Sequence, residues 1–348
     1  MKISDLGEFG LIQKIKEQTK RTSSAPLLGI GDDAAALRIT SSRTLLATSD
    51  MLIEDVHFDL SNTDFTSLGW KSAAVNLSDI AAMGGAPRFC LTSLGLTSHI
   101  TAKQIADFYQ GFDRLAHMHD AMIVGGDTCH SPKGLVISVT VIGEVSLPKM
   151  LKRSGARPGD AIYVTGTLGD SSAGFYLLQQ GVRGSRGRGT KGTATSGERR
   201  LIEHHLRPKP RVEWGRQLGA SGCVSAMIDV SDGISSDLSH VCEQSNVGAL
   251  IYAAAIPLSR ALQQTAPRLQ MPELSYALSG GEDYELLFTV PPARISLLRS
   301  LKLPLTEIGV VTREKTLQIV DSSGRTKPLV PSGYDHFKRR TRPAKKQS

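Results

Sequence analysis

The sequence predicts an α/β protein of two domains. The chain has 348 residues, more than one domain usually holds, and hydrophobic residues make up 40% of it, enough for two packed cores. Strand-like and helix-like segments alternate through both halves, and no short-period repeat is present. We therefore expect an N-terminal domain over 1–147 and a C-terminal domain over 148–338.

Hydrophobic spacing defines the elements of the N-terminal half. The expected elements are helices over 9–20, over 101–119 and over a segment ending near Gly85, and strands over 44–48, 121–124 and 135–145. The first strand runs into Asp50, and the second is followed by Gly125, Gly126 and Asp127. Acidic side chains are therefore expected at two strand ends.

The C-terminal half repeats this alternation. The expected elements are strands over 161–164, 226–228, 286–290, 308–311 and 317–320, and helices that begin after Gly166–Ser172 and near Glu198 and that cover 234–244. A third strand stops at an acid, Asp229, with Asp232 close behind. The turn Gly166–Gly169 either cradles a phosphate with its backbone N–H groups or is a plain connection from strand to helix.

The net charge of +8 is concentrated in two segments. Residues 183–216 and 338–348 carry the excess of lysine and arginine, so the rest of the chain is mildly acidic. The composition of residues 183–197 predicts a disordered basic insertion, and that of residues 339–348 predicts a disordered basic tail. Either these segments are solvated and flexible, or they attract RNA or membrane surfaces weakly.

A nucleic-acid-binding protein is not expected, because the charge lies in the insertion and the tail and no aromatic stacking motif accompanies it.

Other broad features indicate a soluble cytoplasmic protein. No run approaches the ~20 apolar residues that a membrane helix needs. The four cysteines are scattered, without the close pairs of a zinc or redox motif: Cys90, Cys129, Cys223 and Cys242. We expect free thiols in a reducing compartment and no membrane partner.

Asp79 is an unusual residue for its surroundings, the apolar stretch Asn76–Gly85. On a helix, its neighbours three and four positions away cannot neutralise a carboxylate. A buried, unpaired ion costs several kcal/mol, roughly, so Asp79 would need a partner from elsewhere in the chain. Alternatively, it is a solvated residue or the cap of a short helix that begins at Ile80.

Several acids lie in loops rich in glycine, serine and threonine. They are Asp32, Asp50, Asp79, Asp127, Asp229 and Asp232. Each alone could be an ordinary turn residue, but together they would repel one another unless cations lay between them. Oxygen ligands without cysteine or histidine clusters favour Mg²⁺ or Mn²⁺, and magnesium in turn indicates phosphate substrates. No phosphate-binding P-loop and no protein-kinase signature is present.

A set of motifs makes the chain resemble the thiamine-monophosphate kinase family. In order, they are Gly29–Asp33, Thr48–Asp50, Val56–Phe58, Asn76–Gly85, Gly125–Thr128, Asp229–Gly233, Ser279–Leu286 and Gly333–Phe337. The family belongs to the aminoimidazole ribonucleotide synthetase-like superfamily. The resemblance implies that the N-terminal domain binds ATP and Mg²⁺ and pairs with a second copy in a homodimer.

The resemblance also assigns site residues. The implied magnesium ligands are Asp32, Thr48, Ser49, Asp50, Asp79, Asp127, Asp229 and Asp232. The implied nucleotide contacts are Gly126, Asp127, Arg153 and Ser231. The implied substrate contacts are His57, Glu282 and an aromatic residue that is either Tyr334 or Phe337. Arg153 could instead be an ordinary surface arginine, and His57 a packed strand histidine.

The implied activity is that of a phosphotransferase with a phosphate group as acceptor. ATP would phosphorylate thiamine monophosphate to thiamine diphosphate in one in-line step, with several Mg²⁺ ions and no phosphorylated residue. The alternative is another ATP-using synthetase of the superfamily, acting like aminoimidazole ribonucleotide synthetase or selenophosphate synthetase. One departure is Asp55, where the family usually has glycine.

Overall fold

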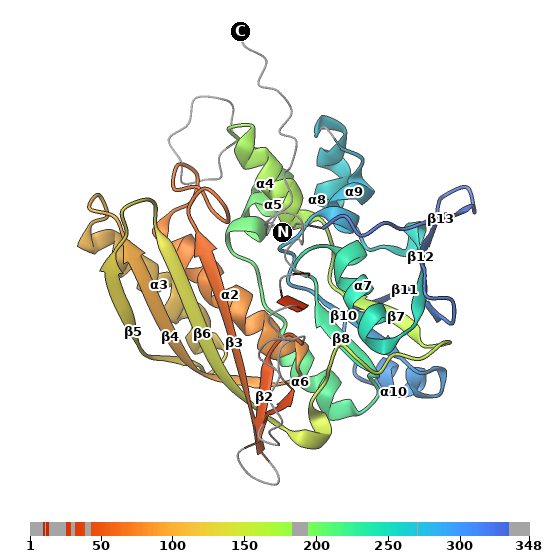
Figure 1. The fold of residues 1–348 in the computed structure, drawn as a ribbon. Coiled ribbons are helices and arrows are strands. Elements are labelled where there is room, and N and C mark those ends of the chain that lie inside the picture. The colour runs from red at the N-terminus through yellow and green to blue at the C-terminus, as the bar shows by residue number, and fades with distance from the viewer. Residues whose placement is uncertain are drawn as a thin grey trace.

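The structure, a computed structural model, contains two mixed β-sheets with helices packed against them (Figure 1). It describes residues 10, 12–13, 26–28, 32–38, 43–182, 194–269 and 271–333. The first sheet uses strands from residues 26–146 and the second uses strands from residues 161–328. This arrangement confirms the predicted α/β class and two-domain architecture. Tyr334, Phe337 and the basic tail at 339–348 lie outside the described residues.

The first sheet has six strands in the order β1-β2-β3-β6-β4-β5. The strands are β1 (Pro26–Leu28), β2 (Ala35–Arg38), β3 (Arg43–Ile53), β4 (Ala86–Leu96), β5 (Met122–His130) and β6 (Val136–Ser146). Only β4 and β5 run parallel to each other, and all other neighbours are antiparallel. The predicted strand over 135–145 corresponds to β6.

Two helices, α2 (Phe65–Ala82) and α3 (Ala102–Met118), lie against one face of this sheet (Figure 1). The side chain of Asp64 caps α2, and Thr101 forms a capping box with Gln104 at the start of α3. The helices cross at two glycines: a Cβ on Gly69 would lie 1.9 Å from the carbonyl oxygen of Phe108, and α3 makes the same kind of approach at Gly111. Both helices were predicted, and Asp79 lies inside α2 rather than capping a shorter helix.

The second sheet has seven strands in the order β13-β12-β9-β11-β7-β10-β8. The strands are β7 (Ala161–Thr165), β8 (Ala226–Asp229), β9 (Gly248–Tyr252), β10 (Leu286–Val290), β11 (Leu305–Thr312), β12 (Leu317–Val320) and β13 (Thr326–Pro328). The α-helices of this half are α4 (Asp170–Gln179), α5 (Ser196–Leu206), α6 (Val212–Ser221), α7 (Ile234–Ser245), α8 (Arg260–Thr265), α9 (Glu273–Ser279) and α10 (Ile295–Ser300). Each strand predicted in this half is present.

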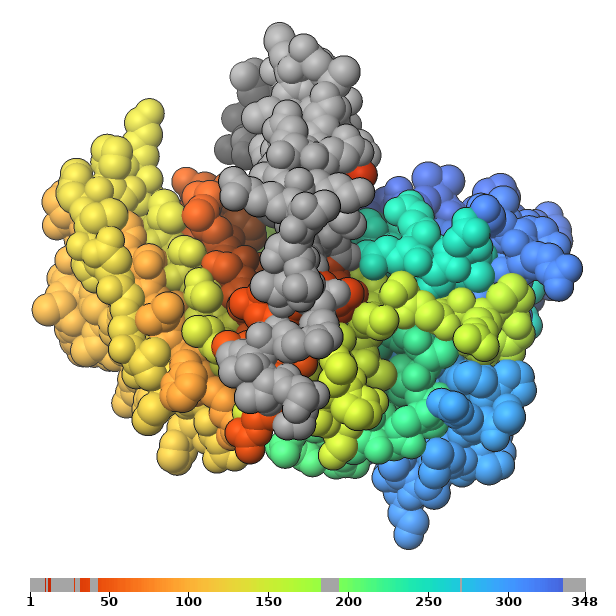
Figure 2. All heavy atoms as spheres, turned by 60° about the horizontal axis from the view of Figure 1, so that its bottom comes forward, coloured from red at the N-terminus to blue at the C-terminus, as the bar shows by residue number. Residues whose placement is uncertain are grey.

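Helix α2 lies at the junction of the two halves. One hydrophobic core contains Leu68 and Leu77 of α2, Leu46 of the first sheet, and Met227 and Phe288 of the second. Most of the helix is buried, which matches its small and apolar residues. Figure 2 shows the two halves side by side, with β4 to β6 on one side and the blue C-terminal elements on the other. Residues on α2 can therefore contact both halves at once.

Three expectations about element boundaries were wrong. Strand β3 continues through Asp50 to Ile53, and β5 continues through Asp127 to His130, so neither acid ends a strand. Of the three acids, only Asp229 is the last residue of its strand. The expected disorder over 183–197 is also wrong at its end, because Thr195 and Glu198 form a capping box that starts α5. Residues 183–193 lie outside the described residues, as does most of the helix expected over 9–20, where Gly10, Ile12 and Gln13 are helical.

Among the described residues, no helix is both long enough and apolar enough to span a bilayer.

Candidate metal and phosphate site

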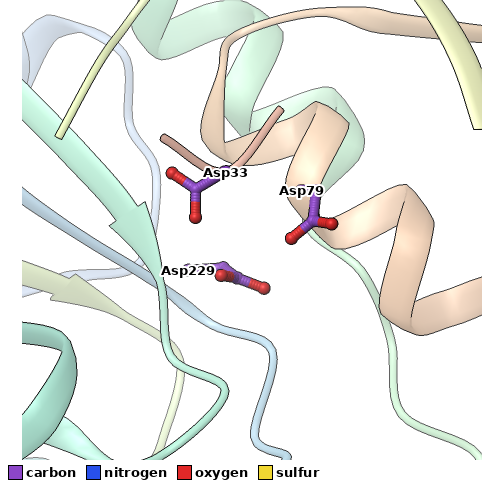
Figure 3. Close-up of side chains that lie close together, drawn as sticks. All are labelled: Asp33, Asp79 and Asp229. Atoms are coloured by element: carbon purple, nitrogen blue, oxygen red, sulfur yellow. The ribbon is translucent and has the colours of Figure 1, made fainter. Parts of the chain in front are cut away.

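Three carboxylates from distant parts of the chain meet at the junction of the two sheets. Asp33 precedes β2, Asp79 lies in the last turns of α2, and Asp229 ends β8. One oxygen atom of each lies within 4.8 Å of the others. Figure 3 shows the three side chains directed toward a common space. Asp79 thus finds neighbours from elsewhere in the chain, but these neighbours are acids.

Neutral hydroxyl groups and one arginine hold the three carboxylates. Thr48 Oγ1 donates a hydrogen bond to Asp79 Oδ2, and Ser78 Oγ donates to Asp229 Oδ2 at 2.6 Å. Arg153 Nη2 lies 2.8 Å from Asp33 Oδ1. The second oxygen of Asp33, Oδ2, is buried and has no hydrogen-bond partner among the described residues. The cluster therefore has unused acceptor capacity directed into it.

The sequence motifs led us to name Asp32 as a metal ligand and not its neighbour Asp33. Asp32 is not one of the three clustered carboxylates, and its Oδ1 accepts hydrogen bonds from the backbone N–H of Asp33 at 3.1 Å and of Arg153 at 3.2 Å. The side chain of Asp33 faces the cluster instead. The signal in the sequence was the pair of acids after a glycine-rich turn, and that pair does not reveal which of the two faces inward.

Two further acids lie around the cluster. Asp50 lies on β3 beside α2, where its backbone N–H donates to Asn76 Oδ1 at 3.1 Å. Asp237, on the first turn of α7, is buried and accepts from the backbone N–H of Asp232 at 3.2 Å. Asp237 was not singled out in the sequence, because it lies within an expected helix rather than after a strand.

The pKa values of these acids are raised. Burial raises the pKa of Asp32 and of Asp50 to about 6, and burial with the charge of Asp33 raises that of Asp229 to about 8. Burial, together with the charges of Asp50, Asp229 and Asp33, raises the pKa of Asp79 well above its usual range. Several buried carboxylates in one place are costly when ionised, so the site is suited to bind cations.

The donor set fits magnesium. Carboxylate and hydroxyl oxygens are the ligands that hard divalent cations prefer, and no cysteine or histidine belongs to the cluster. The buried, unpartnered Oδ2 of Asp33 supplies a free acceptor. The residues present could therefore hold one or more Mg²⁺ ions.

Arg153 is part of this site and is not an ordinary surface arginine. Its side chain is mostly buried, and its guanidinium contacts Asp33. Burial lowers the pKa of Arg153, but the charge and hydrogen bond of Asp33 outweigh that effect and raise it. The arginine thus keeps its positive charge beside the carboxylates, where it could contact a phosphate group as well.

Glu282 and His57, the two substrate contacts that the resemblance implies, are joined through a buried lysine. Lys71 Nζ lies 2.6 Å from Glu282 Oε1 and donates to the backbone oxygen of His57 at 3.3 Å. Burial raises the pKa of Glu282, but Lys71 and then His205 outweigh it, so the pKa is lowered and the carboxylate stays ionised. The backbone N–H of Ile53 donates to His57 Nδ1 at 3.0 Å, which leaves the proton of the neutral ring on Nε2.

Asp55 occupies a backbone position that favours glycine. Its φ is 66°, in the left-handed region, and its N–H donates to the oxygen of Phe58 to close the turn that carries His57. We expect Asp55→Gly to raise the free energy of unfolding by about 0.5–1 kcal/mol in urea melts. The matched control is Asp113→Gly, inside α3, which should lower it. An unchanged or lower stability for Asp55→Gly would contradict this account of the turn.

Some of the residues named from the sequence lie apart from the cluster in a single chain. Ser49 Oγ hydrogen-bonds to Thr140 Oγ1 and to the backbone oxygen of Val139. Gly126 and Asp127 lie on the exposed edge strand β5, where the Asp127 carboxylate accepts from the backbone N–H of Thr128. The backbone of Ser231 contacts the Glu282 segment, because its carbonyl oxygen accepts from the N–H of Glu282 at 2.8 Å.

The turn Gly166–Gly169 is a plain strand-to-helix connection. The N–H of Gly169 donates to Asp283 Oδ2 at 2.6 Å, and the N–H of Ser171 donates to Asp283 Oδ1 at 3.2 Å. The N–H of Leu168 donates to the backbone oxygen of Pro257. These backbone donors are already used, so the alternative of a phosphate cradle is not supported at this turn.

A pocket of about 680 Å³ lies elsewhere, between the loop before α2 and helix α5. Its cationic lining residues are Arg199, Arg200, Arg207, Lys209 and Arg211. Arg211 forms an ion pair with Glu285, and Arg207 donates a hydrogen bond to Ser67 Oγ at 2.9 Å. None of the three clustered aspartates lines this pocket, so it is separate from the candidate metal site.

Known protein families and individual relatives match this chain over most of its length. The family described as AIR synthase related protein, N-terminal domain, matches residues 31–145, and its C-terminal domain family matches residues 157–322. The chain is 37% identical to the thiamine-monophosphate kinase of Bacillus subtilis (strain 168), over 96% of this chain and 100% of the relative. It is 38% identical to that of Escherichia coli (strain K12), over 95% of this chain and 98% of the relative. The chain belongs to the thiamine-monophosphate kinase family.

A solved structure of this family resembles the structure of this chain over nearly its whole length. The structure of AaThiL complexed with AMPPCP and TMP matches with a TM-score of 0.84 and 36% sequence identity, over 97% of this chain and 99% of that chain. Asp33, Asp79 and Asp229 therefore cluster within a fold that this chain shares, over nearly its whole length, with the family member complexed with AMPPCP and TMP.

Proposed function

We propose that this protein is an ATP-dependent kinase that phosphorylates thiamine monophosphate to thiamine diphosphate. The observation that carries this proposal is the convergence of Asp33, Asp79 and Asp229 within a fold of the thiamine-monophosphate kinase family. The relative bound to AMPPCP, an ATP analogue, and to TMP supports both substrates.

Magnesium is the cofactor that the site suits. We assign Asp33, Asp79 and Asp229 as its holders, with Asp50, Asp232 and Thr48 beside them. The bound ions would neutralise phosphate charge and stabilise the transferring group. Asp32, Ser49 and Asp127 stay predictions from the resemblance, and a single chain does not bring their side chains into the cluster.

The chain's own residues divide the remaining tasks. Arg153 holds a positive charge beside the carboxylates, where the nucleotide phosphates would bind, with Gly126, Asp127 and Ser231 as further predicted contacts. The resemblance names His57 and Glu282 as contacts of the acceptor substrate, and Glu282 presents an ionised carboxylate. The aromatic contact, Tyr334 or Phe337, lies outside the described residues.

No general base is required in this reaction. The acceptor is a phosphate, whose second pKa is about 6, so its oxygen is largely ionised at neutral pH. The main obstacle is the repulsion between two phosphate compounds in one site. The residues therefore bind and orient both substrates, and we expect direct in-line transfer without a phosphorylated residue.

The test of this function is an assay of ADP release. Thiamine monophosphate, thiamine and aminoimidazole precursors are supplied in parallel, each with and without Mg²⁺. We expect ADP release that depends on thiamine monophosphate and on Mg²⁺, with thiamine diphosphate as the second product. Turnover on free thiamine but none on its monophosphate would contradict the substrate assignment.

A homodimer is part of the proposal, and an exposed apolar surface supports it. On the face of the first sheet opposite α2 and α3, four large apolar side chains are exposed: Phe89, Leu91, Met122 and Val124. Phe89 pairs with Met122 across β4 and β5, so these side chains form one surface. Exposed apolar patches of this kind mark interaction sites, and β5 also carries the predicted nucleotide contacts Gly126 and Asp127.

We expect the wild-type protein to have twice the chain mass of 37.4 kDa in light scattering. Val124→Glu places a charge on the apolar surface and should shift the protein to the monomer mass, with loss of activity. The matched control is Leu297→Glu, which alters an exposed leucine on α10, away from this surface, and should leave the dimer intact. A monomeric wild-type protein with full activity would contradict the proposed dimer.

We also retain the predicted domain boundary between residues 147 and 148, which lies in the short 3₁₀ turn Leu147–Lys149 that follows β6.

A cytoplasmic location is proposed as well, supported by the four cysteines, which are all free thiols.

A further inference from the structure

Lys71 is a lysine buried in the interior of the protein. It lies in the second turn of α2 and is 1% exposed. Lysine is almost never fully buried without a partner, because removing its charge from water is costly. A lysine in this position therefore indicates a specific electrostatic role, and its partners show what that role is.

The ammonium group of Lys71 joins two segments from different sheets. It lies 2.6 Å from Glu282 Oε1, in the segment before β10 of the second sheet. It also donates at 3.3 Å to the backbone oxygen of His57, in the turn after β3 of the first sheet. Both residues that the resemblance names as contacts of the acceptor substrate are thus held by one side chain.

The carboxylate of Glu282 is fixed on both of its oxygens. His205 Nδ1 lies 3.1 Å from Oε2, and Ser171 Oγ lies 3.2 Å from the same nitrogen. In the tautomer that carries its proton on Nδ1, His205 donates to this carboxylate, which only accepts hydrogen bonds. The backbone of Glu282 is also constrained, with φ at 67° and its N–H bonded to the oxygen of Ser231. The side chain of Glu282 nevertheless remains 28% exposed, so part of it is free to meet a ligand.

The same helix organises the metal site. Ser78, seven residues after Lys71, donates to Asp229, and Asp79, eight residues after it, belongs to the acid cluster. Positions seven and eight apart lie on the same side of a helix. One side of α2 therefore holds the carboxylates near its C-terminal end and the pair Glu282 and His57 two turns earlier.

We propose that Lys71 is a positioning residue for the acceptor substrate, which ties Glu282 of one domain to the His57 turn of the other. Lys71 does not contact the substrate itself. It sets the distance and orientation between the two groups that do, while the same helix sets the distance to the metal-holding aspartates. This proposal rests on the proposed kinase function.

The experiment compares steady-state kinetics of Lys71→Met with wild type, varying thiamine monophosphate and ATP separately. Loss of a charge-assisted contact should raise KM for thiamine monophosphate by about 10-fold or more, with KM for ATP within about twofold of wild type. The matched control is Lys103→Met, which removes the exposed pair of Lys103 with Asp107 on α3 and should change neither KM. A merely structural lysine would lower the melting temperature and the active fraction while leaving both KM values unchanged.

A double-mutant cycle tests whether Lys71 acts through Glu282. If it does, adding Lys71→Met to Glu282→Gln should raise KM for thiamine monophosphate little beyond the effect of Glu282→Gln alone. Fully additive effects would contradict the proposed route. Should Lys71→Met not fold, His205→Leu removes the other contact of Glu282, whereas His205→Asn keeps an N–H donor near the place of Nδ1. We then expect a raised KM for thiamine monophosphate in His205→Leu only, and equal KM values in both would overturn the proposal.

The outcomes for the two proposals are distinguishable. If the wild-type protein shows no ADP release that depends on thiamine monophosphate, the proposed function fails. If the wild type is active and Lys71→Met keeps the wild-type KM for thiamine monophosphate, the kinase assignment stands and the role of Lys71 is disproved.

Discussion

Asp79→Asn is expected to lower kcat by about 10³-fold or more while the protein stays folded. Asparagine keeps the size of the side chain and can still accept the hydrogen bond from Thr48, but it removes the charge that helps to hold a divalent cation. Repulsion from Asp33 and Asp229 disappears as well, so the metal-free variant should be at least as stable as wild type. The measurement is ADP release over a range of Mg²⁺ concentrations, with a urea melt of each protein.

The matched control for this variant is Asp107→Asn. Asp107 lies on α3, where it pairs with Lys103 away from the cluster, and its replacement should leave kcat unchanged. Near-normal turnover of Asp79→Asn at saturating Mg²⁺ would remove Asp79 from the set of metal ligands.

Stability of the metal-free protein is expected to fall as the pH rises from about 4 to 8. Asp32, Asp50 and Asp229 have folded-state pKa values raised from 3.8 to about 6, about 6 and about 8. Between the unfolded and folded pKa values, the folded state binds more protons than the unfolded state, so each rise in pH favours unfolding. The stabilisation is fully present below the unfolded pKa and is lost as the pH passes the folded value. Together these acids should account for several kcal/mol, because a pKa difference of one between the two states corresponds to about 1.4 kcal/mol.

The comparison that isolates this effect uses urea melts in EDTA from pH 5 to 8.5. Asp229→Asn should show a shallower fall than wild type, because it removes an acid whose pKa is raised further than those of Asp32 and Asp50. Mg²⁺ should stabilise the wild type more at pH 8 than at pH 5, since ionised carboxylates bind it better. A metal-free stability that is constant or increases over this range would contradict the picture of crowded buried acids.

Much of the site followed from simple patterns in the sequence. An acid in the apolar stretch Asn76–Gly85 indicated that Asp79 would need a partner from elsewhere in the chain, and the structure places it, half-buried, beside two further acids, Asp33 and Asp229. The strand that stops at Asp229 was also predicted, and β8 ends at that residue. The strand end could be predicted because an apolar run that stops at an acid is a local feature of the sequence, whereas the identity of the neighbours of Asp79 is not.

Other features depend on geometry that local patterns do not contain. Gly125 and Gly126 were expected to follow the end of a strand over 121–124, but β5 continues through them as an edge strand. Glycine is needed at 126 because a Cβ there would lie 1.8 Å from the backbone oxygen of Thr92. Which of Asp32 and Asp33 faces the cluster depends on the local backbone. Lys71 could have been found by the argument applied to Asp79, because it too is a charge inside an apolar helix.

The central claim is that acids from both domains hold divalent cations at the place where the two phosphate substrates meet. The most direct measurement is anomalous diffraction from crystals grown with Mn²⁺, AMPPCP and thiamine monophosphate. We predict anomalous peaks in the space bounded by the carboxylates of Asp33, Asp79 and Asp229, adjacent to the phosphates of both ligands. Ordered ligands with no anomalous peak at these carboxylates, or with manganese held only by other residues, would contradict the claim.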